Sequence, residues 1–154
     1  MTKKLFFLFA VAVIAVLGWW VWTRSAGDSR LPEIETSLPA GVFATAPAID
    51  LEDVTEGDGD GEAWLTIVKG VEYHKVEAHS LPALAGGYFY EGWLVNPKSA
   101  EFFSTGKMRD LGAGEFYLEY QTTNYKDGYT KVVITLEPND SDPSPAAHIL
   151  EGEF

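Results

Sequence analysis

Acidic side chains spaced two residues apart are the first candidates for chemistry in this sequence. In "EGDGDGE", residues 56–62, Glu56, Asp58 and Asp60 alternate with glycine, like the oxygen ligands in the first half of a calcium-binding EF-hand loop. The twelfth position of such a loop needs a bidentate glutamate, but here it is Ile67, inside an apolar run. Two interpretations remain, a weak calcium site at Asp58 and Asp60 or a flexible acidic linker, and the pattern favours the linker.

A second acidic stretch, "EPNDSDPSP" at residues 137–145, places Glu137, Asp140 and Asp142 close to one expected turn. Their carboxylates could gather around a hard cation such as calcium. Asparagine, aspartate, serine and proline are also the residues that turns are made of. We expect a turn here, and Asp140 and Asp142 stay weak metal candidates.

The sequence has three histidines, His74, His79 and His148. His74 and His79 lie five residues apart on one expected strand, so they point to opposite faces and do not share a metal without distortion. A pairing of His79 with His148 across strands stays open. We expect histidines on the surface or at its rim.

Covalent catalysis would need a serine or threonine beside a base and a third group that orients the base. Ser104 and Thr105 precede Gly106, but "FFSTGKM" lacks the strand-to-helix elbow that exposes a nucleophile. The sequence does not locate a glycosidase-like carboxylate pair among 23 acidic residues. We expect no enzymatic activity, no catalytic residue and no cofactor other than the calcium considered above.

Composition excludes further kinds of site and of binding partner. The chain of 154 residues contains no cysteine, which excludes disulfides, a thiol nucleophile, a cysteine zinc site and a lipid-modified cysteine. Its net charge of −12 argues against nucleic acid, because phosphate backbones are bound by lysine and arginine. Cations and basic protein partners fit this charge better.

An uncharged run, "LFFLFAVAVIAVLGWWVWT", extends from Leu5 to Thr23 and is closed by Arg24. As a helix it would be about 28 Å long, close to the roughly 30 Å hydrocarbon core of a bilayer. Three tryptophans gather at one end of the run, where indole rings favour the membrane interface. The pattern predicts a transmembrane helix in residues 5–23.

A cleaved signal peptide is the alternative for this segment, since both have a basic start and an apolar stretch. The run exceeds the usual apolar length of a signal peptide. Arg24, just before "SAG", would also occupy the −3 position of the cleavage site, where a small residue is needed. We therefore expect residues 1–24 to be an uncleaved signal anchor. The expected topology is single-pass in the cell membrane, with the C-terminal domain outside the cytoplasm.

Residues 25–61 contain scattered proline, glycine and acidic residues without periodicity, which is typical of a linker. Within them "AGVFATA" could form a short strand against the domain. Residues 62–154 contain seven short apolar runs separated by turn residues: "AWLTIV", "EYHKVEA", "YFYEGWLV", "EFFSTGKM", "EFYLEYQ", "TKVVITLE" and "AHILEGEF". They predict an all-β domain, an antiparallel immunoglobulin-like β-sandwich that is monomeric.

The expected core follows from alternation along these runs. Phe116 and Leu118 share one face of "EFYLEYQ", and Ile134 and Leu136 share one face of "TKVVITLE". "YFYEGWLVNP", residues 88–97, is apolar on both faces, as in a strand that is covered on both sides. We expect Trp93 to be a core anchor between the two sheets; the alternative is a displayed aromatic patch.

Several motifs in order resemble a known family. Leu81-Pro82, Tyr90 to Val95, "STG" at residues 104–106, Val133 to Pro138 and "LEG" at residues 150–152 are similar in order and spacing to motifs of the extracytoplasmic C-terminal domain of the anti-sigma-K factor family. The similarity covers roughly residues 63–154.

The resemblance implies a membrane-tethered β-sandwich that acts by interaction and under proteolytic control, without catalysis. Members of that family carry a helical sigma-binding domain before the transmembrane helix, and here only Met1 to Lys4 precede the apolar run. We therefore expect a sensor or interaction module with a protein partner, which does not itself hold a sigma factor. The alternative is a calcium-dependent cell-surface or adhesion module.

Overall fold

The computed structural model describes residues 38–154. The predicted transmembrane helix at residues 5–23 and the first part of the linker lie outside this range. Within residues 38–154 no helix is long and apolar enough to cross a membrane.

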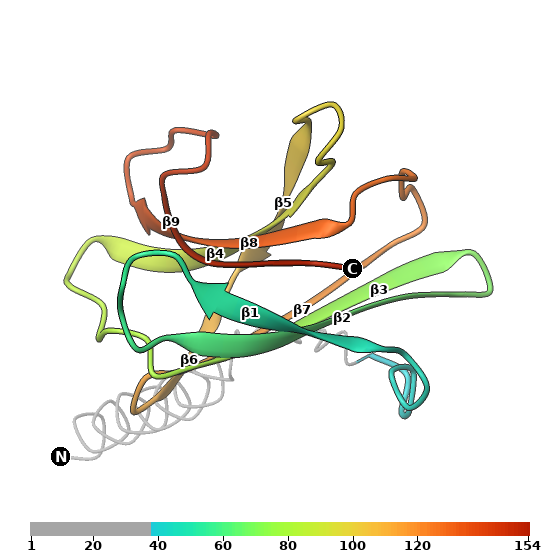
Figure 1. Ribbon diagram of the computed structural model, residues 1–154, viewed down its shortest axis with the longest axis horizontal. Helices are drawn as coiled ribbons and strands as arrows, with labels where there is room; N and C mark the ends of the chain where they lie inside the picture. Colours follow the sequence, from blue (N-terminus) through green and yellow to red (C-terminus); the bar gives the residue numbers. More distant parts are fainter. Residues whose placement is uncertain (1–37) are drawn as a thin grey trace, which may run out of the picture. The chain divides into compact units, whose positions relative to one another are not determined.

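The described residues form nine β-strands and no helix (Figure 1). The strands are β1 (Ala48–Asp53), β2 (Asp60–Val68), β3 (Val71–His79), β4 (Tyr88–Val95), β5 (Phe102–Lys107), β6 (Arg109–Gly112), β7 (Glu115–Thr122), β8 (Lys131–Pro138) and β9 (Ala147–Glu153). Each of the seven predicted runs overlaps one strand, and β1 and β6 are additional. The all-β class is confirmed.

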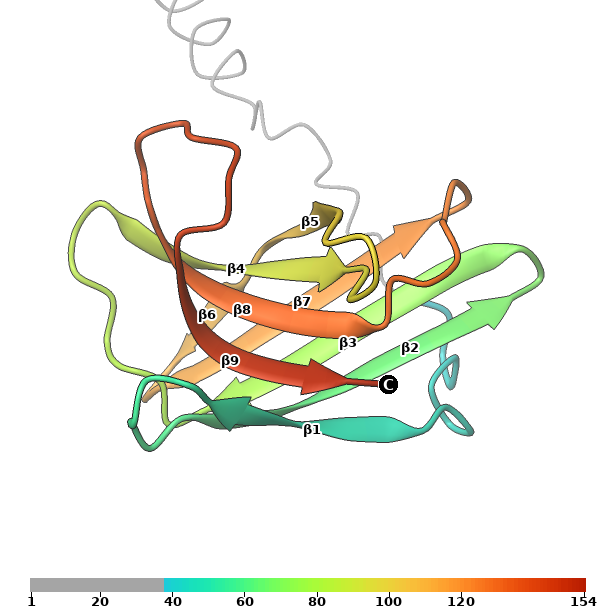
Figure 2. The same cartoon turned by 45° about the horizontal axis from the view of Figure 1, so that its top comes forward.

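All nine strands belong to one antiparallel sheet in the order β5-β4-β8-β9-β1-β2-β3-β7-β6. The sheet bends back on itself between β9 and β1, so that β5, β4, β8 and β9 lie over β1, β2, β3, β7 and β6 (Figure 2). Because the hydrogen-bonded ladder is continuous, two separate sheets of immunoglobulin type are not confirmed. The observed architecture is one nearly closed antiparallel sheet.

The two ends of the sheet approach each other where the chain passes from β5 through Met108 into β6. Beyond the short β6–β7 ladder, no pairing between β5 and β7 occurs among the described strands. Aromatic side chains lie between these two edges, with the Phe103 ring 6.0 Å from that of Tyr120 and 5.1 Å from that of Tyr129. Side-chain packing thus takes the place of the missing ladder.

The core lies between the two layers of the sheet. Tyr90 of β4 meets Phe116 of β7 edge-on, with ring centroids 4.7 Å apart. Phe116, Leu118 and Ile134 are buried in this core, and Leu136 packs against it partly buried. Glycine permits the closest approach, since a Cβ on Gly92 would lie only 2.5 Å from Leu118 Cδ2.

Trp93 is 4% exposed but projects from β4 on the side opposite Gly92, away from the inter-layer core. Its ring meets Phe102 edge-on at 5.8 Å, and its Nε1–H donates to Thr135 Oγ1 at 2.8 Å. The indole is therefore buried on the outer surface of one layer. The expected position, between two layers, differs from this.

The sheet includes residues that the sequence analysis assigned to the linker. Strand β1 pairs with β2 along five residues and with β9 along two, and Leu51 is 2% exposed within the core. Residues 40–46, expected as a possible short strand, form turns instead, with Val42 N–H donating to Pro39 O and Ala44 N–H to Gly41 O. Gly41 adopts a positive φ of 75°, and Pro39 and Pro47 flank the segment, which favours turns over a ladder.

Candidate functional site

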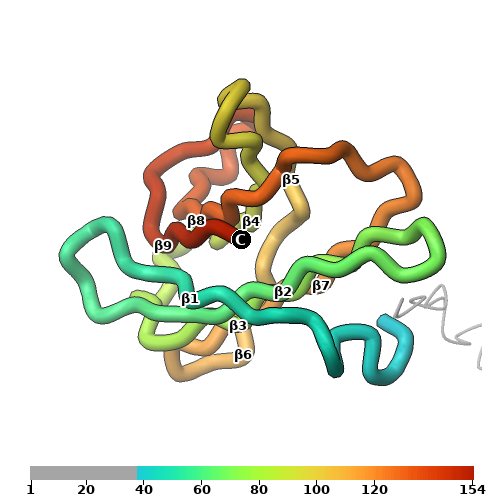
Figure 3. The backbone as a smooth tube through the Cα atoms, turned by 45° about the vertical axis from the view of Figure 1, so that its right-hand side comes forward, coloured from blue at the N-terminus to red at the C-terminus, as the bar shows by residue number. Residues whose placement is uncertain are grey.

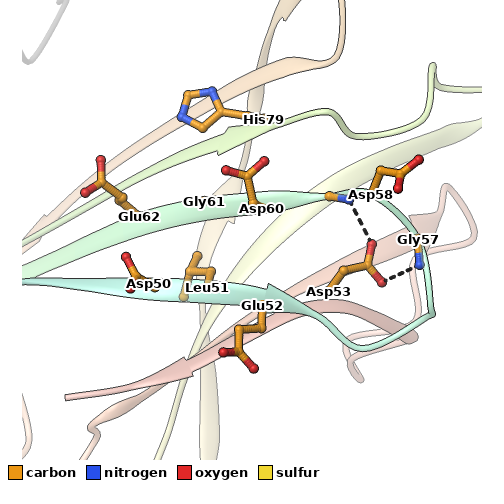
Figure 4. Close-up of a pocket in the computed structure, with 11 residues that line it drawn as sticks. Asp50, Leu51, Glu52, Asp53, Gly57, Asp58, Asp60, Gly61, Glu62 and His79 are labelled. Atoms are coloured by element: carbon orange, nitrogen blue, oxygen red, sulfur yellow. Dashed lines mark hydrogen bonds between the residues drawn. The ribbon is translucent and has the colours of Figure 1, made fainter.

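In the described part of the chain, a hollow with a volume of about 690 Å³ runs along β1 and β2 (Figure 4). Its lining is acidic and consists of Asp50, Leu51, Glu52, Asp53, Gly57, Asp58, Gly59, Asp60, Gly61, Glu62 and His79. The strand register sets Asp50 opposite Glu62 and Glu52 opposite Asp60. Like charges in such positions repel each other, so this surface favours positively charged ligands or partners.

Asp53 organises the turn at one end of this hollow. Its carboxylate accepts hydrogen bonds from the Thr55 hydroxyl at 2.7 Å and from the backbone N–H groups of Thr55, Gly57 and Gly59 at 2.6, 3.1 and 3.2 Å. The Thr55 hydroxyl and these amides lower the pKa of Asp53, against a smaller opposing effect of desolvation. A Cβ on Gly57 would lie 2.6 Å from Asp53 Oδ2, so a larger residue there would displace this carboxylate from its hydrogen-bond donors.

The predicted metal candidates divide between two loops. Asp58 lies in the β1–β2 turn and Asp60 begins β2, and both are exposed. Asp140 and Asp142 lie in the β8–β9 loop, where each accepts a backbone N–H from two residues further on at 2.9 Å. Within residues 38–154 no group of three or more histidine, aspartate or glutamate side chains is arranged to hold a metal. The calcium-dependent alternative therefore has no support here.

His79 and His148 each pair with a glutamate rather than with each other. His79 Nδ1 is 2.5 Å from Glu115 Oε2, and His148 Nδ1 is 2.5 Å from Glu151 Oε1. The hydrogen bond to Glu115 raises the pKa of His79 above its usual value, with added attraction from neighbouring acids. Strands β1 and β2 separate β3 from β9, so His79 and His148 do not form the pair that the sequence left open.

His74 corrects the expectation of surface histidines. Its side chain is fully buried, and among the described residues neither ring nitrogen has a hydrogen-bond partner. Burial lowers its pKa to about 3. Two residues before it, Glu72 is 4% exposed, and burial together with the nearby charge of Asp127 raises its pKa. The alternation of "VEYHKVEA" puts Glu72 and His74 on the same face as the apolar Val76 and Ala78. The polar character of Glu72 and His74 nevertheless favoured a surface position in the sequence-based prediction.

The residues considered for nucleophilic catalysis serve the local strand structure. The Ser104 hydroxyl donates to the Glu91 carboxylate and accepts Gly106 N–H at 3.0 Å. Thr105 is the extra residue where the β4–β5 register shifts, and it is 5% exposed. Glu137, which the sequence offered as an oxygen ligand with Asp140 and Asp142, accepts hydrogen bonds from the Thr135 hydroxyl and from the Ala146 N–H at 2.8 Å. This arrangement stabilises a bulge and a loop.

Comparison with known proteins gives one match. The model of a family described as "Anti-sigma-K factor rskA, C-terminal" matches residues 5–149 of the chain. No curated protein and no solved structure matches this chain significantly.

Proposed function

Because the chain belongs to the family of anti-sigma-K factor C-terminal domains, we propose that it is a membrane-anchored regulatory protein whose β domain lies outside the cytoplasm. It acts by binding a protein partner, and it has no catalytic role. One observation carries this proposal. The family match begins at Leu5 and ends within β9, so one family model spans the apolar run together with the β domain.

The charge of the domain supports a role in binding. The strand register gathers carboxylates from β1 and β2 along one hollow, and the exposed loops at the same end add Asp140 and Asp142. Complementary charge speeds association and selects among partners. A partner with a basic surface suits this domain.

Cysteine labelling tests the anchor and its orientation, because the natural chain has no cysteine. Two single-cysteine variants are compared in intact cells with a membrane-impermeant maleimide. Ser144→Cys places a thiol in the exposed β8–β9 loop, and Thr2→Cys places one before the apolar run. We expect labelling of Ser144→Cys in intact cells and of Thr2→Cys only after the membrane is opened. The reverse pattern, or recovery of the chain in the soluble fraction, contradicts the proposal.

A further inference from the structure

We propose that one end of the β domain docks on the surface of an anionic bilayer. This end, called the hairpin end, consists of the tip of the β2–β3 hairpin, residues 67–71, and the neighbouring β7–β8 loop, residues 123–130. The inference rests on the membrane anchor proposed above and adds to it an orientation of the domain and a lipid contact.

The hairpin tip exposes aliphatic side chains next to a lysine. Ile67 and Val68 end β2 and are 49% and 38% exposed. Lys69 and Gly70 form a two-residue turn with φ of 52° and 79°, which matches the twist of the strands and fixes the tip. The tip projects beyond the neighbouring strands in both views (Figures 2 and 3). Apolar side chains flanked by lysine are typical of segments that insert into the headgroup region.

The β7–β8 loop extends this surface. It lies beside the hairpin tip in both views (Figures 2 and 3), and the charge of its Asp127 acts on Glu72 at the start of β3. The loop carries partly exposed Tyr125 and exposed Lys126. Tyrosine favours the membrane interface, and Lys126 adds a second positive charge to that of Lys69. With Asp127 included, the hairpin end keeps a net positive charge.

The opposite end of the domain is acidic. Because the strands are antiparallel, the β1–β2 turn and the β8–β9 loop lie at the far end of the sheet from the hairpin tip. They carry Glu56, Asp58, Asp140 and Asp142 and no lysine or arginine. An anionic bilayer repels this acidic end and attracts Lys69 and Lys126, so the field of the membrane turns the hairpin end toward it.

The connection of the chain also favours this orientation. Strand β1 runs antiparallel to β2, so its first residue, Ala48, lies toward the end of β2 that leads to the hairpin tip. Residues 38–47 therefore lead into the sheet from the hairpin end. Tethering near the bilayer raises the local concentration of lipid for a weak contact, so few docking residues suffice.

A fluorescence experiment on the full chain tests the docking. A polarity-sensitive fluorophore is attached to Val68→Cys, or to Ser144→Cys at the acidic end as control, in a chain that otherwise has no cysteine. Each chain is reconstituted into vesicles of phosphatidylcholine, with or without phosphatidylglycerol. We expect a blue shift and quenching by spin-labelled lipid for the Val68 label in anionic vesicles, and neither for the Ser144 label.

Charge reversal provides the matched control. Lys69→Glu with Lys126→Glu should reduce the ratio of docked to undocked domain at least about fivefold for each lysine changed. Lys107→Glu with Arg109→Glu makes the same change of charge on β5 and β6, away from the hairpin tip, and should leave docking unchanged. Docking should also weaken at high salt.

Two outcomes overturn the inference, and they differ in what else they remove. If the chain floats with the vesicles while the Val68 label stays in a water-like environment, the proposed membrane anchor is supported and the proposed docking of the hairpin end is wrong. If the chain does not float with the vesicles, the anchor itself is wrong and the docking falls with it.

Discussion

At the scale of single residues, His74 couples stability to pH. Its folded pKa of about 3 lies below the usual value of 6.5, so the unfolded chain binds the proton more readily. The stabilisation is complete above about pH 6.5 and is lost as the pH falls toward 3. Between pH 7.5 and pH 5 this one group should remove about 2 kcal/mol from the free energy of unfolding.

His74→Leu tests this assignment, since leucine has a similar volume and no polar atoms. Urea unfolding of both proteins at pH 7.5 and pH 5 separates the His74 contribution from that of His79 and Glu72, which both proteins share. We expect the variant to be at least as stable at pH 7.5 and clearly more stable than the parent at pH 5. An equal loss of stability in both proteins on acidification would show that His74 is not the titrating group.

Trp93 is the second residue whose removal should be costly. It is 4% exposed and its N–H donates to Thr135, which is fully buried. Trp93→Ala should lower the free energy of unfolding by about 3–5 kcal/mol, and Trp93→Phe, which loses mainly the hydrogen bond, by about 1 kcal/mol. Thermal unfolding checks the order of the three proteins. An alanine variant that melts within about two degrees of the parent would favour the displayed aromatic patch instead.

At the scale of elements, the close approach of β4 and β7 depends on Gly92. An added Cβ would meet Leu118 Cδ2 at 2.5 Å and Thr105 Oγ1 at 2.8 Å. Gly92→Ala should therefore destabilise the fold by about 1–3 kcal/mol through overpacking. Gly86→Ala is the matched control, because no atom lies within 4 Å of its added Cβ. Equal denaturation midpoints for the two variants would contradict this account of the packing.

The sequence predicted a strand wherever apolar and polar residues alternated strongly. It did not predict the position of each strand in the sheet. "EFYLEYQ" and "TKVVITLE" alternate cleanly, and they became β7 and β8 with Phe116, Leu118 and Ile134 in the core. Strand β1 was hidden because "AIDLED" stands between proline-rich and glycine-rich acidic stretches that resemble a linker. Its ladder with β9 pairs Glu52 with Glu151, a contact distant in sequence that periodicity does not encode.

The site residues show the same limit. The turn chemistry of Asp140 and Asp142 could be read from residue types, because such side chains bond to backbone two residues on. The pairing of His79 with Glu115 needs the register between β3 and β7. For Trp93, a strand apolar on both faces gave no way to tell the inter-layer side from the outer side.

At the scale of the whole domain, β1 joins the two layers. It is the only link between β9 and β2 in the described sheet order, and Leu51 fills part of the core. A fragment of residues 38–154 should unfold cooperatively as a monomer, whereas residues 62–154, the domain expected from sequence, should lose the cooperative transition. Urea unfolding and sedimentation of both fragments check this. Equal midpoints would mean that β1 is dispensable.

The regulatory role is the central claim, and transcript profiling tests it most directly. The chromosomal gene is deleted and then complemented by the full chain or by a chain that lacks residues 48–154. We expect deletion to change the abundance of the transcripts that depend on one sigma factor. The full chain should restore their abundance, and the truncated chain should not. Unchanged sigma-dependent transcripts in the deletion strain, under conditions where the protein is produced, would contradict it.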